Sequence, residues 1–282
     1  MKRFNLTIIL MLTVLLLCAA SVSAQEEGSE VLFTGHISPE GLQAIYNAFS
    51  WDPAGNVAVL LSAGESERSN FLPPELIGDL VQGLGAVIVE SNTAYSGSRS
   101  VTPEHYQTAE ARGYTEIADF QVFDEYGSVE LPVGNGIRLE SVPVGAHFGD
   151  YESYVIITHF TGDEKTGYAG AIENTAFGLA SAMGKVRIQS GGLSDTHLQD
   201  GGHDEFLEAM AEAGMAVSDA LSGSIIYINV MDRLSVDSDS DPDPSEPEMQ
   251  DIGILASYDP VALDQACLDL IKKAEGNGRF LQ

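Results

Sequence analysis

Five short runs of apolar residues recur along the chain, and each has the length and composition of a buried strand. The runs cover residues 57–62, 86–91, 154–158, 225–230 and 251–257. Three of them are almost continuously apolar, which is typical of strands that are covered on both faces. We therefore predict a sheet that is sandwiched between two layers.

Segments with apolar residues at helical spacing lie between these runs, at 38–49, 73–84 and 204–221, and further helices start at Thr102 and Asp259. A serine or aspartate followed by proline favours a helix start, because the side chain can cap free N–H groups and proline suits the first turn. Strands that alternate with helices predict an α/β fold, with a mainly parallel sheet flanked by helices in a single large domain.

The N-terminal residues have the pattern of a secretory leader. Two basic residues precede an apolar run at 6–20, and small residues precede Gln25. We predict a signal peptide at 1–24 and a mature domain at 25–282, which is secreted or extracytoplasmic, at the cell surface or in the periplasm. An uncleaved anchor, or a lipid on Cys18, is the alternative, and either one would place the protein at a membrane.

The charge is strongly unbalanced, since 13 Lys and Arg stand against 42 Asp and Glu, for a formal net charge of −29. Such a surface repels phosphate backbones and argues against nucleic-acid binding, whereas it suits cation binding or salty surroundings. Removal of the leader leaves Cys267 as the last cysteine. It lies on an apolar helical face, so we expect a core residue rather than a nucleophile.

The most informative stretch is central and covers residues 154–191, where a strand is followed by closely spaced glycines and charged side chains. Ligand sites in parallel sheets lie at the carboxyl ends of the strands. A solvated turn is the alternative to a site. The polar residues expected to crowd this loop are His159, Asp163, Lys165, Glu173, Asn174 and Lys185.

This stretch resembles a bacterial and archaeal family known only as domain of unknown function 362. Its members carry His-Phe-Lys-Gly-His, then Gly-x-Gly-Gly-Ala-Ile-Lys-Asn and a Gly-Lys pair, and the likeness extends over most of 57–271. The matching positions here are His159, Phe160, Gly162, Gly167, Gly170, Ala171, Ile172, Asn174, Gly178, Gly184 and Lys185. The resemblance implies ligand binding at Asn92, Tyr95, Arg99, His159, Gly167, Gly170, Asn174, Lys185 and Asp259.

The chain departs from the family pattern at several polar positions. Thr161, Asp163, Glu173 and Gln189 stand where the family has Lys, His, Lys and His. Family members often carry Cys-Asp-Cys, associated with an iron–sulfur cluster, where residues 238–240 read Ser-Asp-Ser. Clusters are normally held by thiolates, so no iron–sulfur cluster is expected here.

An acidic loop at 237–248 follows the fourth strand, and its alternating carboxylates echo a calcium loop. Pro242 occupies the position where that loop requires glycine, which leaves two alternatives, a looser Ca²⁺ site and a solvated acidic loop. The metal ligands would be Asp237, Asp239, Asp241, Asp243 and Glu248.

Two functions remain open, and in both the partner is a small molecule or a divalent cation. The first is an exported surface protein that is non-catalytic or binds cations, and has lost the metal chemistry of the family. The second is an enzyme that acts on a small acidic metabolite through a pocket of His159, Asn174, Lys185 and Asp259.

Overall fold

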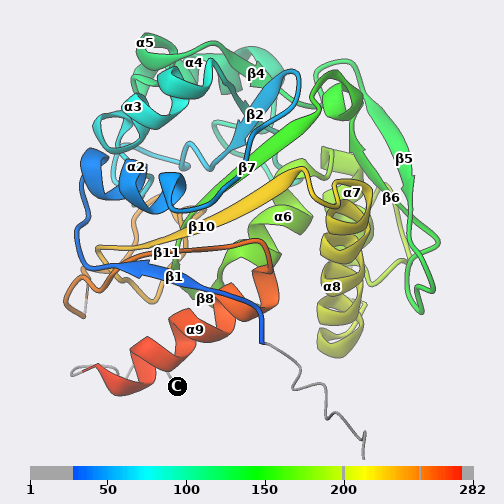
Figure 1. Ribbon diagram of the computed structural model, residues 1–282. Helices are drawn as coiled ribbons and strands as arrows, with labels where there is room; N and C mark the ends of the chain where they lie inside the picture. The colour runs from blue at the N-terminus through cyan, green and yellow to red at the C-terminus, as the bar shows by residue number, and fades with distance from the viewer. Residues whose placement is uncertain (1–27, 199–200, 248, 275–282) are drawn as a thin grey trace, which may run out of the picture.

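A seven-stranded sheet forms the centre of the molecule (Figure 1) in a computed structural model, which describes residues 28–198, 201–247 and 249–274. The strand order is β1-β11-β10-β7-β2-β3-β4. The strands are β1 (Leu32–Thr34), β2 (Val57–Leu60), β3 (Val87–Glu90), β4 (Phe120–Val122), β7 (Ser153–His159), β10 (Ile225–Met231) and β11 (Gly253–Ser257). The pairs from β10 to β4 are parallel, and β1 and β11 are antiparallel to their neighbours, which confirms the predicted fold class.

Helices cover both faces of this sheet (Figure 1). They are α2 (Pro39–Asn47), α3 (Pro74–Leu84), α4 (Thr102–Ala111), α5 (Tyr114–Ile117), α6 (Ala171–Leu179), α7 (Ala182–Gln189), α8 (His203–Ala220) and α9 (Pro260–Lys273), with a 3-10 turn η1 (Ala146–Asp150). None of the helices in the described ranges is long and apolar enough to cross a membrane.

Two hydrophobic cores lie on the two faces of the sheet. Val155 and Ile157 of β7 point to one core with α2 and α3, and Ile156 points to the other core with α6, α8 and α9. This alternation is what a strand buried on both sides requires. Cys267 is fully buried in the second core, as expected, and burial raises the pKa of its thiol.

The helix starts agree with the sequence signals. Ser38 Oγ accepts a hydrogen bond from Gly41 N at 3.1 Å, and Asp259 Oδ1 accepts bonds from Val261 N and Ala262 N at 2.9 and 3.0 Å. Each bond satisfies an N–H group that has no partner inside the helix.

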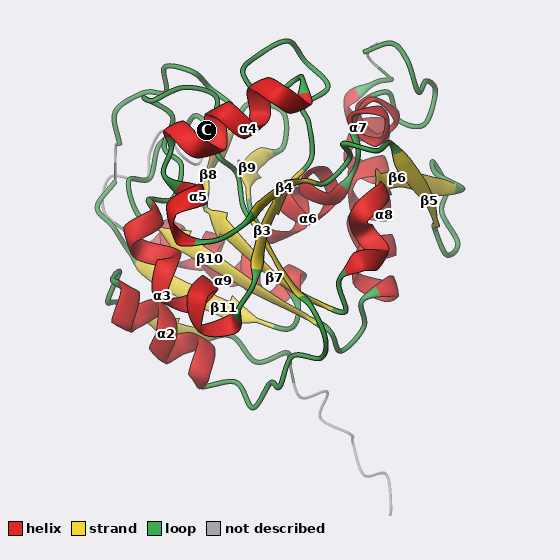
Figure 2. Cartoon of the chain, turned by 90° about the horizontal axis from the view of Figure 1, so that it is seen from above, coloured by secondary structure: helices red, strands yellow, loops and turns green. Residues whose placement is uncertain are grey.

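Two hairpins were not predicted, because neither has a long apolar run. One pairs β5 (Ser128–Pro132) with β6 (Ser141–Gly145), and it projects beside α7 and α8 (Figure 2). The other pairs β8 (Thr161–Asp163) with β9 (Gly167–Ala169), immediately after β7. The second hairpin matters for function, because it rises from the carboxyl edge of the parallel strands.

Candidate functional site

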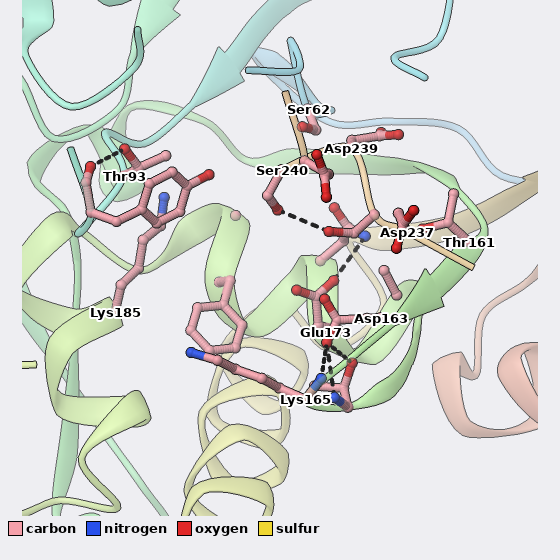
Figure 3. A pocket seen from close by; sticks show the side chains of 18 of the residues that line it. Ser62, Thr93, Thr161, Asp163, Lys165, Glu173, Lys185, Asp237, Asp239 and Ser240 are labelled. Atoms are coloured by element: carbon pink, nitrogen blue, oxygen red, sulfur yellow. Dashed lines mark hydrogen bonds between the residues drawn. The ribbon is translucent and has the colours of Figure 1, made fainter. Parts of the chain in front are cut away.

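A cavity of about 390 Å³ opens at the carboxyl ends of β2, β3 and β7. The β8–β9 hairpin, α6, α7 and the first half of the acidic loop complete its walls (Figure 3). Cavities of this size are typical of small-molecule sites, and the location is the one predicted for a parallel sheet.

The structure brings most of the predicted residues together at this cavity. All six polar residues of the central stretch line it, and so do Tyr95, Arg99 and Gln189. Three carboxylates of the acidic loop, Asp237, Asp239 and Asp241, lie on the same wall. Residues predicted for the ligand or the metal that do not line the cavity are Asn92, Gly167, Gly170, Asp243 and Asp259. Glu248 lies outside the described residues.

The floor of the cavity holds a buried ion pair between Arg99 and Glu90. Arg99 Nη1 donates to Glu90 Oε1, and Glu90 Oε2 contacts His105 Nε2 at 3.0 Å and accepts from Ala63 N at 3.0 Å. Burial disfavours the charged carboxylate, but Arg99, His105 and Lys185 outweigh it and hold the pKa of Glu90 at about 2. Arg99 is therefore neutralised by its partner and is not a free anion receptor.

His159 ends β7 and is held between two aspartates. Its Nδ1 lies 2.9 Å from Asp239 Oδ1, and its Nε2 lies 3.2 Å from Asp232 Oδ1 and 2.7 Å from the Asp232 carbonyl oxygen. Burial disfavours the imidazolium, but the two carboxylates outweigh this effect and raise the pKa of His159 to about 9. His159 is therefore a cation at neutral pH that fixes the acidic loop to the sheet.

Lys185 of α7 reaches the carboxyl end of β3. Its Nζ donates to the carbonyl oxygens of Ser91 and Asn92, both at 2.8 Å. Burial lowers the pKa of Lys185 to about 8, although Asp124 and Glu90 oppose this change. Asn92 acts here through its backbone, while its side chain donates to Asp124 Oδ1 at 2.9 Å.

Glu173 and Asn174 lie in the first turn of α6 and line the cavity (Figure 3 labels Glu173), and Asn174 Nδ2 donates to Glu173 Oε2 at 3.3 Å. Burial, together with the carboxylates of Asp163, Asp239 and Asp264, raises the pKa of Glu173 to about 8. Glu173 therefore holds a proton at pH 7 unless a cation lies beside it.

Asp264 of α9 fixes the start of α6 from below. Its carboxylate accepts bonds from Ala171 N at 2.8 Å and Ile172 N at 3.0 Å, and from Asn229 Nδ2 at 2.7 Å. A Cβ at Gly170 would lie 2.6 Å from Asp264 Oδ1, so this glycine permits a close approach rather than ligand binding. Gly167 has φ +82° and serves the tight turn of the hairpin.

The four aspartates of the acidic loop have different partners. Asp237 Oδ2 accepts a hydrogen bond from Ser245 N, and Asp241 Oδ1 accepts one from Asp243 N, both at 2.8 Å. Asp239 contacts His159. The Asp243 carboxylate forms an ion pair with Arg68 at 2.8 Å. Among the described residues no three His, Cys, Asp or Glu side chains form a group that could hold a metal ion. Calcium binding by this loop stays a prediction.

The positions that match the family's Cys-Asp-Cys lie on the cavity wall. Ser238 Oγ and Ser240 Oγ are 3.2 Å apart, on either side of Asp239. Hydroxyls are poor ligands for iron–sulfur clusters, so these residues do not fit such a cofactor.

Glu90 and Phe177 shape the cavity but carried no clear sequence signal, and Thr161 was noted only as a departure from the family pattern. Glu90 is the last residue of an apolar strand, and Phe177 is an aromatic residue on α6, which consists mainly of small residues. Thr161 follows His159 and Phe160 as the first residue of β8. Its Oγ1 is buried and has no hydrogen-bond partner in the part of the chain that the structure describes, although Thr161 lines the cavity. A buried hydroxyl without a partner is uncommon in native proteins, and a ligand or an ordered water can supply the missing hydrogen bond.

The fold and the cavity define an α/β protein with a polar binding site at the carboxyl edge of a mainly parallel sheet. The chain belongs to the family described as Domain of unknown function (DUF362), whose model matches residues 57–269. A comparison with curated proteins found no match.

Two solved structures share the fold. The lactate racemase apoprotein from Thermoanaerobacterium thermosaccharolyticum matches with a TM-score of 0.51 and 10% identity, over 85% of this chain and 56% of that one. A protein from Thermotoga maritima matches with a TM-score of 0.50 and 13% identity, over 86% of this chain and 61% of that one. The chain therefore spans less than two thirds of either structure, and the likeness shows the fold alone.

Proposed function

We propose that this protein is an exported binding protein whose cavity takes a small organic cation. The observation that carries the proposal is the excess of acids on the cavity wall. Seven carboxyl groups line it, against the four basic side chains of Arg99, His159, Lys165 and Lys185. The acids are Glu90, Asp163, Glu164, Glu173, Asp237, Asp239 and Asp241.

The buried pairs do not balance this excess. Glu90 pairs with Arg99 and Asp239 pairs with His159, and the carboxyl groups of Asp163, Glu164, Glu173 and Asp241 still outnumber the two lysines on the wall. Burial, and after it the nearby carboxylates of Asp163, Asp239 and Asp264, disfavour the ionisation of Glu173, so Glu173 retains a proton. A cation in the cavity relieves the repulsion between these carboxyl groups. The volume suits an organic molecule better than a bare ion.

We expect 1,4-diaminobutane to stabilise the purified protein at pH 7 and constant ionic strength. A ligand at ten times its dissociation constant contributes about 1.4 kcal/mol, or a rise of about 3–6 °C in the melting temperature. Glu173→Gln should reduce the shift. Lys165→Gln, which removes a cation from the cavity wall, should increase it, and thermal melting measures both.

Succinate and calcium chloride serve as controls in the same melting series. Stabilisation by succinate in place of the diamine would contradict the proposal. Stabilisation by Ca²⁺ that is lost in the triple variant Asp237→Asn, Asp239→Asn, Asp241→Asn would favour a calcium site in the acidic loop instead.

An enzyme is the second candidate, and one observation favours it. Glu173 and Lys185 line the same cavity, and both have a pKa of about 8, so each can exchange a proton near neutral pH. Two features weigh against the pocket proposed from the sequence. His159 has both ring nitrogens engaged, and Asp259 caps α9 and contacts Ser29. Selective binding of succinate is the result that would support an enzyme for small acids.

Export is proposed from the leader, which lies outside the described residues. We expect the native protein to begin at or near Gln25 and to lie outside the cytoplasmic membrane. N-terminal sequencing measures this directly. Soluble cytosolic protein that starts at Met1 would contradict it.

A further inference from the structure

We infer that the cavity is built for a primary alkylammonium, with its head between α6 and β8 and its alkyl tail against Phe177. This inference rests on the proposed function and specifies the ligand. It follows from the position of three kinds of side chain on the cavity wall.

The first kind is a carboxyl group and an aromatic ring on α6, from Glu173 and Phe177. Glu173 and Phe177 are four residues apart, so they lie one above the other on the same face of the helix, with their Cβ atoms about 5–6 Å apart. Both line the cavity, and Phe177 is only partly buried. A carboxyl group beside a partly exposed phenyl ring is complementary to an ammonium that carries an apolar chain, because the acid attracts the charge and the ring can bury the chain.

The second is the polar face of β8. Thr161 and Asp163 alternate along this strand and therefore point to the same side, and both line the cavity (Figure 3). Gly162 faces the opposite way, because a Cβ there would lie 2.4 Å from the Val236 carbonyl oxygen. The alternation places an acid and a hydroxyl on the cavity side of β8, where Asp163 Oδ1 also accepts bonds from Lys165 N and Thr166 N at 2.9 and 2.8 Å.

The third is the buried Thr161 hydroxyl, which has no hydrogen-bond partner among the described residues. It can accept a hydrogen bond from a ligand that carries N–H groups. A primary ammonium has three donors, and its possible acceptors on the cavity wall are the Thr161 hydroxyl and the carboxyl groups of Asp163 and Glu173. A quaternary ammonium has no donor and would leave the hydroxyl without a partner.

The aromatic wall continues beyond Phe177. Phe206 lines the cavity too, with its ring centroid 6.1 Å from that of Phe177, and Tyr95 lies on the β3 side. The cavity wall therefore presents carboxyl groups on β8 and in the first turn of α6, and a pair of phenyl rings from α6 and α8. This division gives a ligand with a charged head and an apolar tail one preferred orientation.

Isothermal titration calorimetry at pH 7 and constant ionic strength tests the inference with three probes. These are butylammonium, methylammonium and tetramethylammonium. Butylammonium should bind at least about five-fold more tightly than methylammonium, because its alkyl tail is buried, and than tetramethylammonium, because it has N–H donors.

Two variants separate the head from the tail. Thr161→Val keeps the shape of the side chain and removes its hydroxyl, so it should lower the affinity for butylammonium about ten-fold. Phe177→Leu should lower the affinity for butylammonium about five-fold and change the affinity for methylammonium by less than about two-fold. Thr115→Val, at an exposed residue of α5, is the matched control and should bind all probes as the wild type does. Melting without ligand checks that each variant is folded.

The outcomes distinguish the inference from the proposed function. If the three cations bind equally well, and the variants bind like the wild type, the inference is overturned and a general cation site remains. If none of the cations binds, the proposed function itself has failed.

Discussion

Replacement of Arg99 by methionine should lower the free energy of unfolding by about 3–5 kcal/mol, because it leaves the buried carboxylate of Glu90 without its charged partner. Both side chains are about 95% buried, and Arg99 also contacts Ser62, Tyr95 and Glu65. Urea denaturation measures the loss without adding salt.

Arg68→Met is the matched control, since the Arg68–Asp243 pair has the same chemistry but both side chains are 74% exposed. Exposed pairs contribute about 0–1 kcal/mol. The double variant Glu90→Gln, Arg99→Met should regain part of the loss, because no charge is then buried alone. If Arg99→Met lowers the free energy of unfolding no more than Arg68→Met does, the Glu90–Arg99 ion pair does not stabilise the fold as proposed.

The stability of the protein should depend on pH through His159. The pKa is about 9 in the folded protein and about 6.5 in an unfolded chain, so the folded state binds this proton more tightly. Its contribution is therefore complete below pH 6.5 and is lost as the pH rises through 9. We expect a contribution of about 3 kcal/mol, since each tenfold change in proton affinity corresponds to about 1.4 kcal/mol.

Comparison of variants isolates this effect from Glu173 and Lys185, which titrate in the same range. The difference in unfolding free energy between wild type and His159→Gln should be largest near pH 6 and should shrink toward pH 9.5. Asp239→Asn removes the carboxylate that faces Nδ1, so in this variant the decline should begin at lower pH. A difference that does not change with pH would show that His159 is not held as a cation.

The central strands and most of the helices that cover them could be predicted, because burial on both faces leaves a continuous apolar run. The apolar run at 154–158 corresponds to β7 (Ser153–His159), and the helix starts at Ser38 and Asp259 are marked by their caps. The β5–β6 and β8–β9 hairpins were missed, since their strands are short and polar and are held by contacts that sequence does not reveal.

The site could be predicted in place but not in detail. Loops that follow parallel strands meet at one edge of the sheet, so His159, Glu173 and Lys185 were expected to lie together, and all three line one cavity. The partner of each charge depends on contacts far apart in the chain, such as His159 with Asp239, 80 residues later. For the same reason the sequence predicted that the carboxylates of the acidic loop share one metal site, whereas in the structure its aspartates contact different residues.

Proton release on ligand binding tests the cation site most directly. Glu173 has a pKa of about 8, so it is about 90% protonated at pH 7, and an ammonium beside it must lower that pKa. Titration of butylammonium by calorimetry, in two buffers of different ionisation enthalpy, counts the protons released. We expect somewhat less than one proton per ligand in the wild type, and a much smaller release with weaker binding in Glu173→Gln. Binding that releases no proton and is unchanged in Glu173→Gln would contradict a cation site at this cavity.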